Sequence, residues 1–202
     1  MIVIIEGSQG SGKTHLIRSL KNHVEREGLE NIIFYKYQHV AHLSNLNIEH
    51  IEPDPSFHYF TISNTLTILE LQQSILRDKV FVFDRGIISA YAWSILRKRL
   101  NEVALDTEFR KFLGNELFSN CHIIRINASH QMERDHSDIF DNYTNAAVEN
   151  TIIDLLINKN RDLLQNKGRG NSYHEITNHM DKLSEASLYQ IFVKILSENN
   201  NK

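Results

Sequence analysis

Short apolar runs alternate along the chain with longer stretches in which apolar residues recur at every third or fourth position. The short runs are rich in β-branched and aromatic residues, which is typical of strands that a parallel sheet buries on both faces. They predict strands at Ile2–Ile5, Ile32–Tyr37, Val80–Phe83, Cys121–Ile126 and, with fewer apolar residues, Ser172–Ile176.

The longer stretches have the spacing of amphipathic helices. The first begins at Lys13, places Leu16, Leu20 and Val24 on one face, and has Gly28 where a helix would end. Further helices are predicted over Phe57–Leu76, Ile87–Leu100, Thr107–Phe118, about Tyr143 to Gly168, and from about Ser184 to a polar tail at Asn199–Lys202. Their predicted core-facing residues include Leu71, Ile75, Val148, Ile152, Leu155, Leu156, Leu163, Leu188, Ile191, Phe192, Ile195 and Leu196.

Strands and helices alternate from one end of the chain to the other, which predicts one α/β domain over residues 1–202 with a doubly wound parallel sheet. We find no internal repeat, low-complexity block or linker-like tract that would divide it. Both prolines, Pro53 and Pro55, lie in the aperiodic segment 38–56. Irregular segments of that length are typical of functional loops.

A glycine-rich octapeptide lies between the first predicted strand and the first helix. It matches the P-loop pattern G-x-x-x-x-G-K-[ST] with the residues Gly7, Ser8, Gln9, Gly10, Ser11, Gly12, Lys13 and Thr14. In such a loop the glycines let successive backbone N–H groups turn toward phosphate oxygens at the positive end of the following helix. We expect Lys13 to reach the β and γ phosphates of a bound nucleotide and Thr14 to bind Mg²⁺. The alternative, a turn without a ligand, does not require a lysine here.

The third predicted strand ends at Asp84, which is followed by Arg85. Ligands of open α/β sheets bind at the carboxyl ends of the strands, so Asp84 is a second candidate ligand for Mg²⁺. A guanidinium matches phosphoryl oxygens, so Arg85 is suited to bind a phosphate or to offset charge that develops during transfer. A helix N-cap aspartate beside a surface arginine is the alternative interpretation.

Composition narrows the class of protein. The 202 residues carry a formal net charge of -3, so the basic balance of a dedicated duplex-binding protein is missing. The single cysteine, Cys121, excludes an intramolecular disulfide, and the N-terminal apolar run is too short for a signal peptide or a membrane span. We therefore expect a cytoplasmic protein without a membrane partner. The 11 histidines form no recognised ligand set with cysteine or carboxylate partners, so no zinc site is predicted.

Two groups of residues carry a resemblance to a known family. Ile5-Glu6-Gly7 at the start of the P-loop, and Phe83-Asp84-Arg85-Gly86 with Ser89-Ala90-Tyr91 downstream, resemble the thymidylate kinase and deoxynucleoside kinase group of P-loop kinases. In the order of elements the likeness covers essentially the whole chain. It implies a three-layer fold with a five-stranded parallel sheet in the order 2-3-1-4-5 flanked by helices. It also implies that Asp84 binds the metal and Arg85 the phosphates, and that the chain forms a homodimer.

The same resemblance implies a mobile lid after the fourth strand and an acceptor-binding region after the second. The lid corresponds to about residues 129–142, with Arg134 as the arginine that closes over the phosphates. The acceptor region corresponds to about residues 37–75, where Phe57, Tyr59 and Phe60 are candidates for stacking on a base, and core packing is the alternative role for them.

The identity of the acceptor stays open. Gln9 stands where thymidylate kinases usually carry an acid, and Tyr37-Gln38-His39 stands where deoxynucleoside kinases usually place a general-base glutamate. Glu52, next to Pro53, is a candidate base or substrate ligand if the loop returns to the site, and a solvated loop acid is the alternative.

These motifs predict transfer of the γ-phosphoryl of ATP, as its Mg²⁺ complex, to a nucleoside or a (deoxy)nucleoside monophosphate, with Lys13, Asp84, Arg85 and Arg134 as the catalytic residues. A kinase acting on a hydroxyl or phosphate of polymeric DNA or RNA is an alternative, with Arg97-Lys98-Arg99 as the basic run that would follow a backbone. A GTPase switch is disfavoured because Asn158-Lys159-Asn160-Arg161-Asp162 departs by one residue from Asn-Lys-x-Asp. A non-catalytic ATP-binding module is disfavoured by the Asp84-Arg85 pair and the lid, and a non-kinase NTPase is the less favoured alternative.

Overall fold

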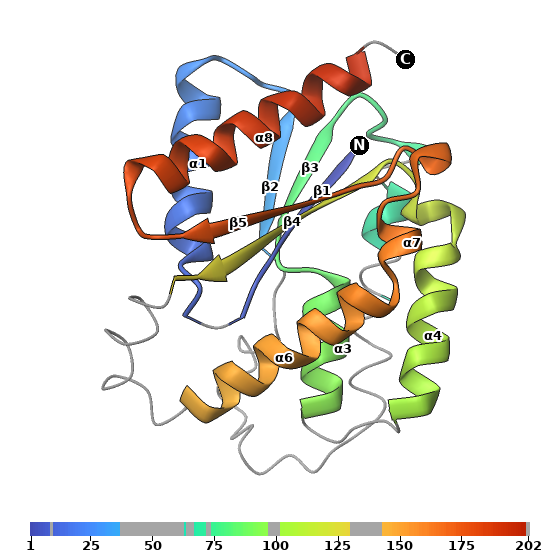
Figure 1. Ribbon diagram of the computed structural model, residues 1–202. Helices are drawn as coiled ribbons and strands as arrows, with labels where there is room; N and C mark the ends of the chain where they lie inside the picture. Colours follow the sequence, from blue (N-terminus) through green and yellow to red (C-terminus); the bar gives the residue numbers. More distant parts are fainter. Residues whose placement is uncertain are drawn as a thin grey trace, which may run out of the picture.

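The computed structural model describes residues 1–8, 10–36, 63, 67–71, 74–96, 102–129 and 143–200. Within these ranges, five strands form one parallel sheet in the order β2-β3-β1-β4-β5 (Figure 1). The strands are β1 (Ile2–Glu6), β2 (Ile32–Lys36), β3 (Val80–Asp84), β4 (Cys121–Ala128) and β5 (Ser172–Asn178). The predicted fold class and strand order are therefore confirmed.

Helices cover both faces of the sheet (Figure 1). On one face lie α1 (Lys13–Arg26) and α8 (Lys182–Asn200), and on the other lie α3 (Ile87–Leu96), α4 (Glu102–Gly114), α6 (Tyr143–Lys159) and α7 (Arg161–Leu164). Two short 3-10 turns, η3 (Glu116–Phe118) and η4 (Lys167–Arg169), precede β4 and β5. No helix in the described ranges is long and apolar enough to cross a lipid bilayer.

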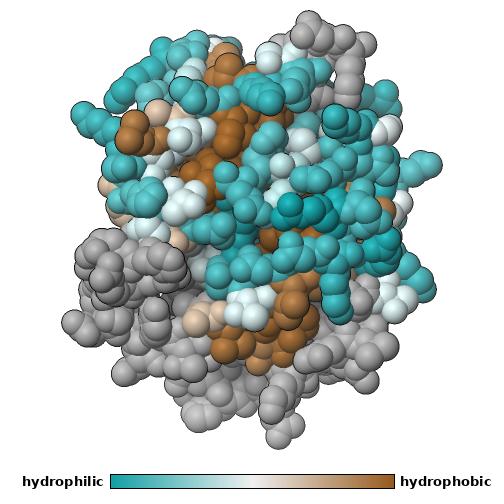
Figure 2. Space-filling view, viewed as in Figure 1, coloured by the Kyte–Doolittle hydropathy of each residue, from teal (hydrophilic) through white to brown (hydrophobic). Residues whose placement is uncertain are grey.

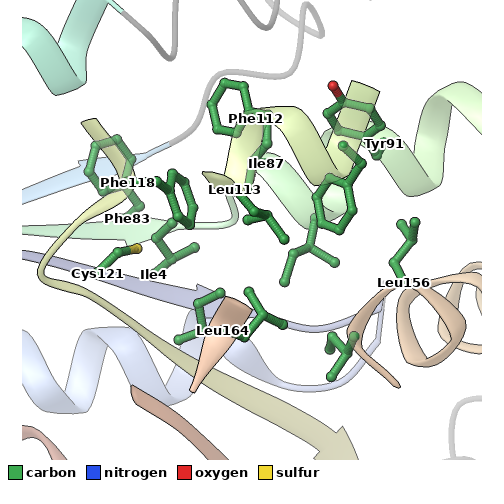
Figure 3. Packing of buried hydrophobic residues seen from close by; sticks show 14 of the residues in the cluster. Ile4, Phe83, Ile87, Tyr91, Phe112, Leu113, Phe118, Cys121, Leu156 and Leu164 are labelled. Atoms are coloured by element: carbon green, nitrogen blue, oxygen red, sulfur yellow. The ribbon is translucent and has the colours of Figure 1, made fainter. Parts of the chain in front are cut away.

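The two hydrophobic cores follow from the alternation of side chains along each strand. On β1, Ile2 and Ile4 pack toward α3 and α6, whereas Val3 and Ile5 pack toward α1 and α8. Both faces are buried, which explains why the strand is an uninterrupted apolar run. Figure 3 shows the first of these cores, formed among others by Ile4, Phe83, Ile87, Tyr91, Phe112, Leu113, Phe118, Cys121, Leu156 and Leu164.

Two charged residues continue this alternation at the carboxyl ends of the central strands. Glu6 follows Ile2 and Ile4 on β1, and Arg125 occupies the equivalent face of β4. The two residues are partners in the strand register, and both are fully buried. The α3/α6 layer therefore changes from an apolar core to a charged one as the sheet approaches the P-loop.

Several predicted boundaries are wrong. The helix expected over Thr107–Phe118 begins earlier, at Glu102, and ends at Gly114, and the strands at Cys121 and Ser172 extend to Ala128 and Asn178. The helix expected from Tyr143 to Gly168 ends at Lys159, because the buried Asn160 donates its side-chain amide to the Leu156 carbonyl oxygen at 2.8 Å and interrupts the helix. The last helix continues into the predicted polar tail as far as Asn200.

Two predicted core faces are wrong in part. On α6, Leu156 is buried and Ile152 packs against the core as predicted, but Leu155 is 55% exposed and Val148 is exposed too, while Ile153 and Ile157 are buried instead. The buried face of α6 is thus rotated from the predicted one, and apolar side chains appear on the surface over this helix in Figure 2. Near residue 70, Leu69 is buried while Leu71 and Ile75 are exposed. Leu188, Phe192 and Ile195 of α8 are buried as predicted.

Candidate active site at the P-loop

The P-loop connects the end of β1 to the start of α1. Gly10 and Gly12 have φ angles of 77° and 76°, in the left-handed region that glycine adopts without steric cost. Gly7 is required for a different reason, because a Cβ atom there would lie 2.7 Å from the Ile126 carbonyl oxygen. Gly12 is the N-cap of α1, provides no side chain to cap it, and the first turn holds no acidic residue. The first N–H groups of α1 are therefore suited to bind an anion.

Lys13 folds back onto this loop. Its Nζ donates to the Ser8 carbonyl oxygen at 2.7 Å and to Ser11 Oγ at 3.2 Å, and the residue is only 5% exposed. Burial, followed by the charge of Arg85, lowers the pKa of Lys13 to about 7. A phosphate bound beside Nζ would favour the charged ammonium again.

Three carboxylates act in the opposite direction on Lys13. The charges of Glu149, Asp84 and Glu6 each raise its pKa, and so partly offset the effect of burial. Five charged side chains, two basic and three acidic, therefore influence one another at the carboxyl ends of β1 and β3.

The end of β5 supports the loop from the other side. Asn178, fully buried, donates its side-chain amide to the Ser11 carbonyl oxygen at 2.9 Å and accepts from the Met180 N–H at 2.8 Å. One side chain thereby connects the P-loop to the start of the segment between β5 and α8.

Asp84 and Arg85 lie beside the start of the loop because β3 is the neighbour of β1. Asp84 pairs in register with Ile5, and the Arg85 N–H donates to the Ile5 carbonyl oxygen at 2.9 Å. Arg85 has a φ angle of 69°, a left-handed conformation that costs a non-glycine residue roughly 1 kcal/mol. The backbone at this position is therefore fixed by the end of β1.

The side chain of Arg85 is held by an acid from α6. Its Nη1 donates to Glu149 Oε1 at 2.6 Å, and Trp93 Nε1 of α3 donates to the same oxygen at 3.1 Å. Glu149 is only 1% exposed. This ion pair joins α6 to the turn between β3 and α3.

Glu6 joins the same turn to β1. Its Oε1 accepts the Ile88 and Ser89 N–H groups at 3.2 Å and 3.3 Å, and its Oε2 accepts the Ser89 hydroxyl. The carboxylate thus accepts hydrogen bonds from the free N–H groups at the N-terminus of α3, and this helix begins directly after Asp84, Arg85 and Gly86. Burial raises the pKa of Glu6, whereas the bonds from Ser89 and the charges of Arg85 and Lys13 lower it.

The donor chemistry of this site fits Mg²⁺. Thr14 is exposed at the start of α1 and Asp84 is partly exposed at the end of β3, and both offer the oxygen ligands that Mg²⁺ prefers. In the described ranges, no group of three or more His, Cys, Asp or Glu side chains is arranged to hold a metal ion. A cation held by Thr14 and Asp84 would take its other ligands from phosphate oxygens and water.

The structure describes the P-loop residues other than Gln9, together with Asp84 and Arg85. Lys13 and Thr14 begin α1, directly after the loop that follows β1, and Asp84 and Arg85 lie at the end of β3, the neighbour of β1 in the sheet. The remaining predicted residues lie outside the described ranges; they are Gln9, Glu52, Phe57, Tyr59, Phe60, Arg134 and the basic run at 97–99.

Sequence reasoning did not assign Glu6, Glu149 and Asn178 to the site. Glu6 could have been found as an acid on the buried parity of β1, and Glu149 as an acid on the stripe of α6 that continues with Ile153 and Leu156. Asn178 carries no local signal, because its role depends on the distance between the end of β5 and the P-loop.

Comparison with known proteins gives a likeness in fold. No protein-family model matches the chain, and no curated protein matches it in sequence. Among solved structures, the chain is similar to the thymidylate kinase from Ehrlichia chaffeensis, with 16% sequence identity and a TM-score of 0.60 over 97% of this chain and 98% of that one. At this identity the likeness shows the fold, which is that of the P-loop kinases.

Proposed function

We propose that this protein is an ATP-dependent phosphotransferase that moves the γ-phosphoryl group to a nucleoside or a (deoxy)nucleoside monophosphate. The observation that carries the proposal is the convergence of the P-loop lysine, Lys13, with Asp84 and Arg85 on the adjacent strand. A P-loop alone is compatible with any P-loop nucleoside triphosphatase or kinase. The acid and arginine at the end of β3, together with the fold that the chain shares with a thymidylate kinase, support a kinase.

In the proposed reaction an acceptor oxygen attacks the γ-phosphorus while the bond from that phosphorus to the bridging oxygen breaks, which leaves ADP. Lys13 and the N–H groups at the start of α1 bind the phosphates, and Arg85 offsets charge on the transferred group. No covalent enzyme intermediate is needed, because phosphoryl transfer depends mainly on positioning and charge stabilisation. Mg²⁺, when bound through Thr14 and Asp84, would neutralise charge on the β and γ phosphates.

The two acceptor classes differ in what they need from the protein. A hydroxyl acceptor must lose its proton, for which Glu52 or Asp84 is the candidate base. A phosphate acceptor is already ionised and needs none. Glu6 and Glu149 are unsuited to the role, since each carboxylate is buried and already engaged by donors of α3 or by Arg85.

A labelled-phosphate panel tests the proposal. Nucleosides, (deoxy)nucleoside monophosphates and single- and double-stranded oligonucleotides are incubated with ATP that carries label in the γ position. We expect label in a nucleoside or a monophosphate. Label in oligonucleotides alone would replace the proposal with a polynucleotide kinase, and release of inorganic phosphate alone would replace it with a hydrolase.

The proposed lid residue has its own test. Arg134→Ala should lower turnover on the order of 10²-fold, because a donor that acts on the transition state is lost, while ATP affinity in the absence of acceptor changes little. Steady-state kinetics and an ATP titration measure the two quantities. Unchanged turnover would remove Arg134 from the mechanism.

The homodimer and the cytoplasmic location stay predictions. Val148 and Leu155 expose apolar surface on α6, which is compatible with a second copy covering that helix. Light scattering after size exclusion measures the mass in solution, and a monomeric mass would refute the dimer.

A further inference from the structure

Glu149 is a buried acid on the core-facing side of α6, in line with Ile153 and Leu156. A carboxylate without a partner at this position would destabilise the fold strongly, because burial removes its hydration. It is retained with two donors on a single oxygen, Arg85 Nη1 at 2.6 Å and Trp93 Nε1 at 3.1 Å. The same position could hold an apolar residue that continues the α6 core, so the acid points to a role beyond packing.

The contacts of Arg85 show what the acid does. The backbone N–H of Arg85 is bound to the Ile5 carbonyl oxygen, and the Nη1 edge of its guanidinium is bound to Glu149. A guanidinium offers five N–H donors in a rigid plane, and within the described ranges only Nη1 is used by another residue. Arg85 is therefore fixed at both ends while most of its donors are left for a ligand.

The charges around Lys13 point in the same direction. Arg85 and Lys13 repel each other, and the Glu149 carboxylate pairs with Arg85 and attracts Lys13. Two cations that converge on one anion site are thus kept in place by an acid from a third element. Without that acid, the Arg85 guanidinium would lose its fixed orientation beside Lys13, because its side chain is long and rich in rotamers.

We infer that Glu149 is a positioning residue for the transfer reaction: it holds Arg85 by the Nη1 edge, so that the remaining guanidinium donors face the phosphates bound by the P-loop. Trp93 acts through Glu149, because its indole N–H fixes the carboxylate. The inference rests on the proposed function, and it adds α6 and α3 to the elements that determine turnover.

The inference predicts opposite effects on binding and turnover. Removal of the acid frees Arg85 for any phosphate and removes a negative charge near it, so a ground-state nucleotide should bind at least as tightly as before. Because loss of Glu149 also lowers the pKa of Lys13, which is about 7 in the wild-type protein, ADP affinity is compared at a pH well below 7, where the lysine is charged. The orientation needed in the transition state is lost, so turnover should fall. General loosening of the structure would weaken both quantities.

The test compares Glu149→Ala, Glu149→Gln and Trp93→Phe with the wild-type protein. We expect Glu149→Ala to lower kcat on the order of 10²-fold while the Kd of ADP stays equal or decreases. Glu149→Gln keeps an acceptor oxygen for both donors and should recover part of the lost kcat. Trp93→Phe should lower kcat a few-fold, and it should have no further effect in the Glu149→Ala background.

A matched control comes from another ion pair of the same length. Arg110 Nη2 and Asp162 Oδ2 are also 2.6 Å apart, but both side chains are about half exposed and join α4 to α7, at the far end of α6 (Figure 1). Asp162→Ala should leave kcat and ADP affinity unchanged. Thermal unfolding of every variant establishes that the comparison is made on folded protein.

The outcomes separate this inference from the proposed function. If the wild-type protein transfers phosphate and Glu149→Ala retains wild-type kcat, the positioning role is refuted and the kinase stands. A parallel loss of kcat and ADP affinity, or a full additional effect of Trp93→Phe in the Glu149→Ala background, also refutes it. If Glu149→Ala does not fold, the positioning role is tested with Glu149→Gln and Trp93→Phe, again by kcat and by the Kd of ADP. If the wild-type protein transfers phosphate to no acceptor, both proposals fail together.

Discussion

The two helical layers differ most where the sheet reaches the P-loop. On the α1/α8 side, Ile5, Ile126 and Ile176 continue the apolar core to within one or two residues of the ends of their strands. On the α3/α6 side the adjacent strand positions carry the buried charges Glu6 and Arg125, with the Arg85–Glu149 pair nearby. Burial of apolar side chains stabilises a fold, whereas burial of a charge carries a desolvation penalty that its partners must offset. The difference indicates that the α1/α8 layer supplies an apolar core and carries Lys13 and Thr14 at the start of α1, whereas the α3/α6 layer holds the charged side chains around Arg85.

The largest effect tests the apolar layer. Phe192 is fully buried on α8, so Phe192→Ala should reduce the free energy of unfolding by about 3–5 kcal/mol through the lost contacts and the cavity left behind. Urea denaturation measures this change. ADP affinity of the folded fraction should stay unchanged. A loss below about 1 kcal/mol, or a large loss of ADP affinity, would contradict the division between the layers.

A smaller effect tests the charged layer through pH. Because burial raises the pKa of Glu6, the folded state holds this proton more tightly than the unfolded state, whose value is near 4.5. Stability should therefore be lost as the pH rises from about 4.5 through the raised pKa, by at most about 1.4 kcal/mol per pH unit.

Glu6→Gln removes this titration and keeps an oxygen that accepts from the N-terminus of α3. Urea denaturation of both proteins at half-unit steps between pH 4.5 and 8 gives the difference in slope, and the variant should be the flatter of the two. Parallel stability curves would show that Glu6 has an ordinary pKa in the folded protein.

The smallest effect concerns a single hydrogen bond of the same layer. Ser89→Ala removes the hydroxyl donor to the Glu6 carboxylate and should cost about 1–2 kcal/mol, because that carboxylate is buried. Ser94→Ala is the matched control, since Ser94 is also buried on α3 but donates to the Ala90 carbonyl oxygen of its own helix. A larger cost for the control, measured by urea denaturation, would contradict the importance assigned to Glu6.

The fold was predictable because its signals are local. Short β-branched runs and helical spacing identify the strands of the sheet and most helices, and the P-loop identifies β1 and α1. The sequence resemblance then supplied the strand order. The errors occurred where contacts between distant parts of the chain determine the structure. One is the end of α6, where the side chain of Asn160 bonds to the Leu156 carbonyl oxygen. The other is the buried face of α6, because its apolar residues are compatible with two neighbouring faces.

The site was predictable only in the part that lies in continuous motifs. Lys13 and Thr14 complete the P-loop motif between β1 and α1, and Asp84 and Arg85 stand at the end of β3. Glu149 lies 64 residues from its partner Arg85, and Glu6 lies 83 residues from Ser89. Such pairs become visible only when the register of β1 with β3 and the rotation of α6 are known.

The most direct test of the central claim is phosphoryl transfer by the wild-type protein and by Lys13→Ala under identical conditions. The two are incubated with γ-labelled ATP, Mg²⁺ and the best acceptor from the nucleoside and monophosphate panel, and labelled product is counted over time. We predict transfer by the wild-type protein and a loss on the order of 10³-fold in Lys13→Ala, with the variant folded by circular dichroism. Equal transfer by both proteins would contradict the assignment of the P-loop as the phosphate site.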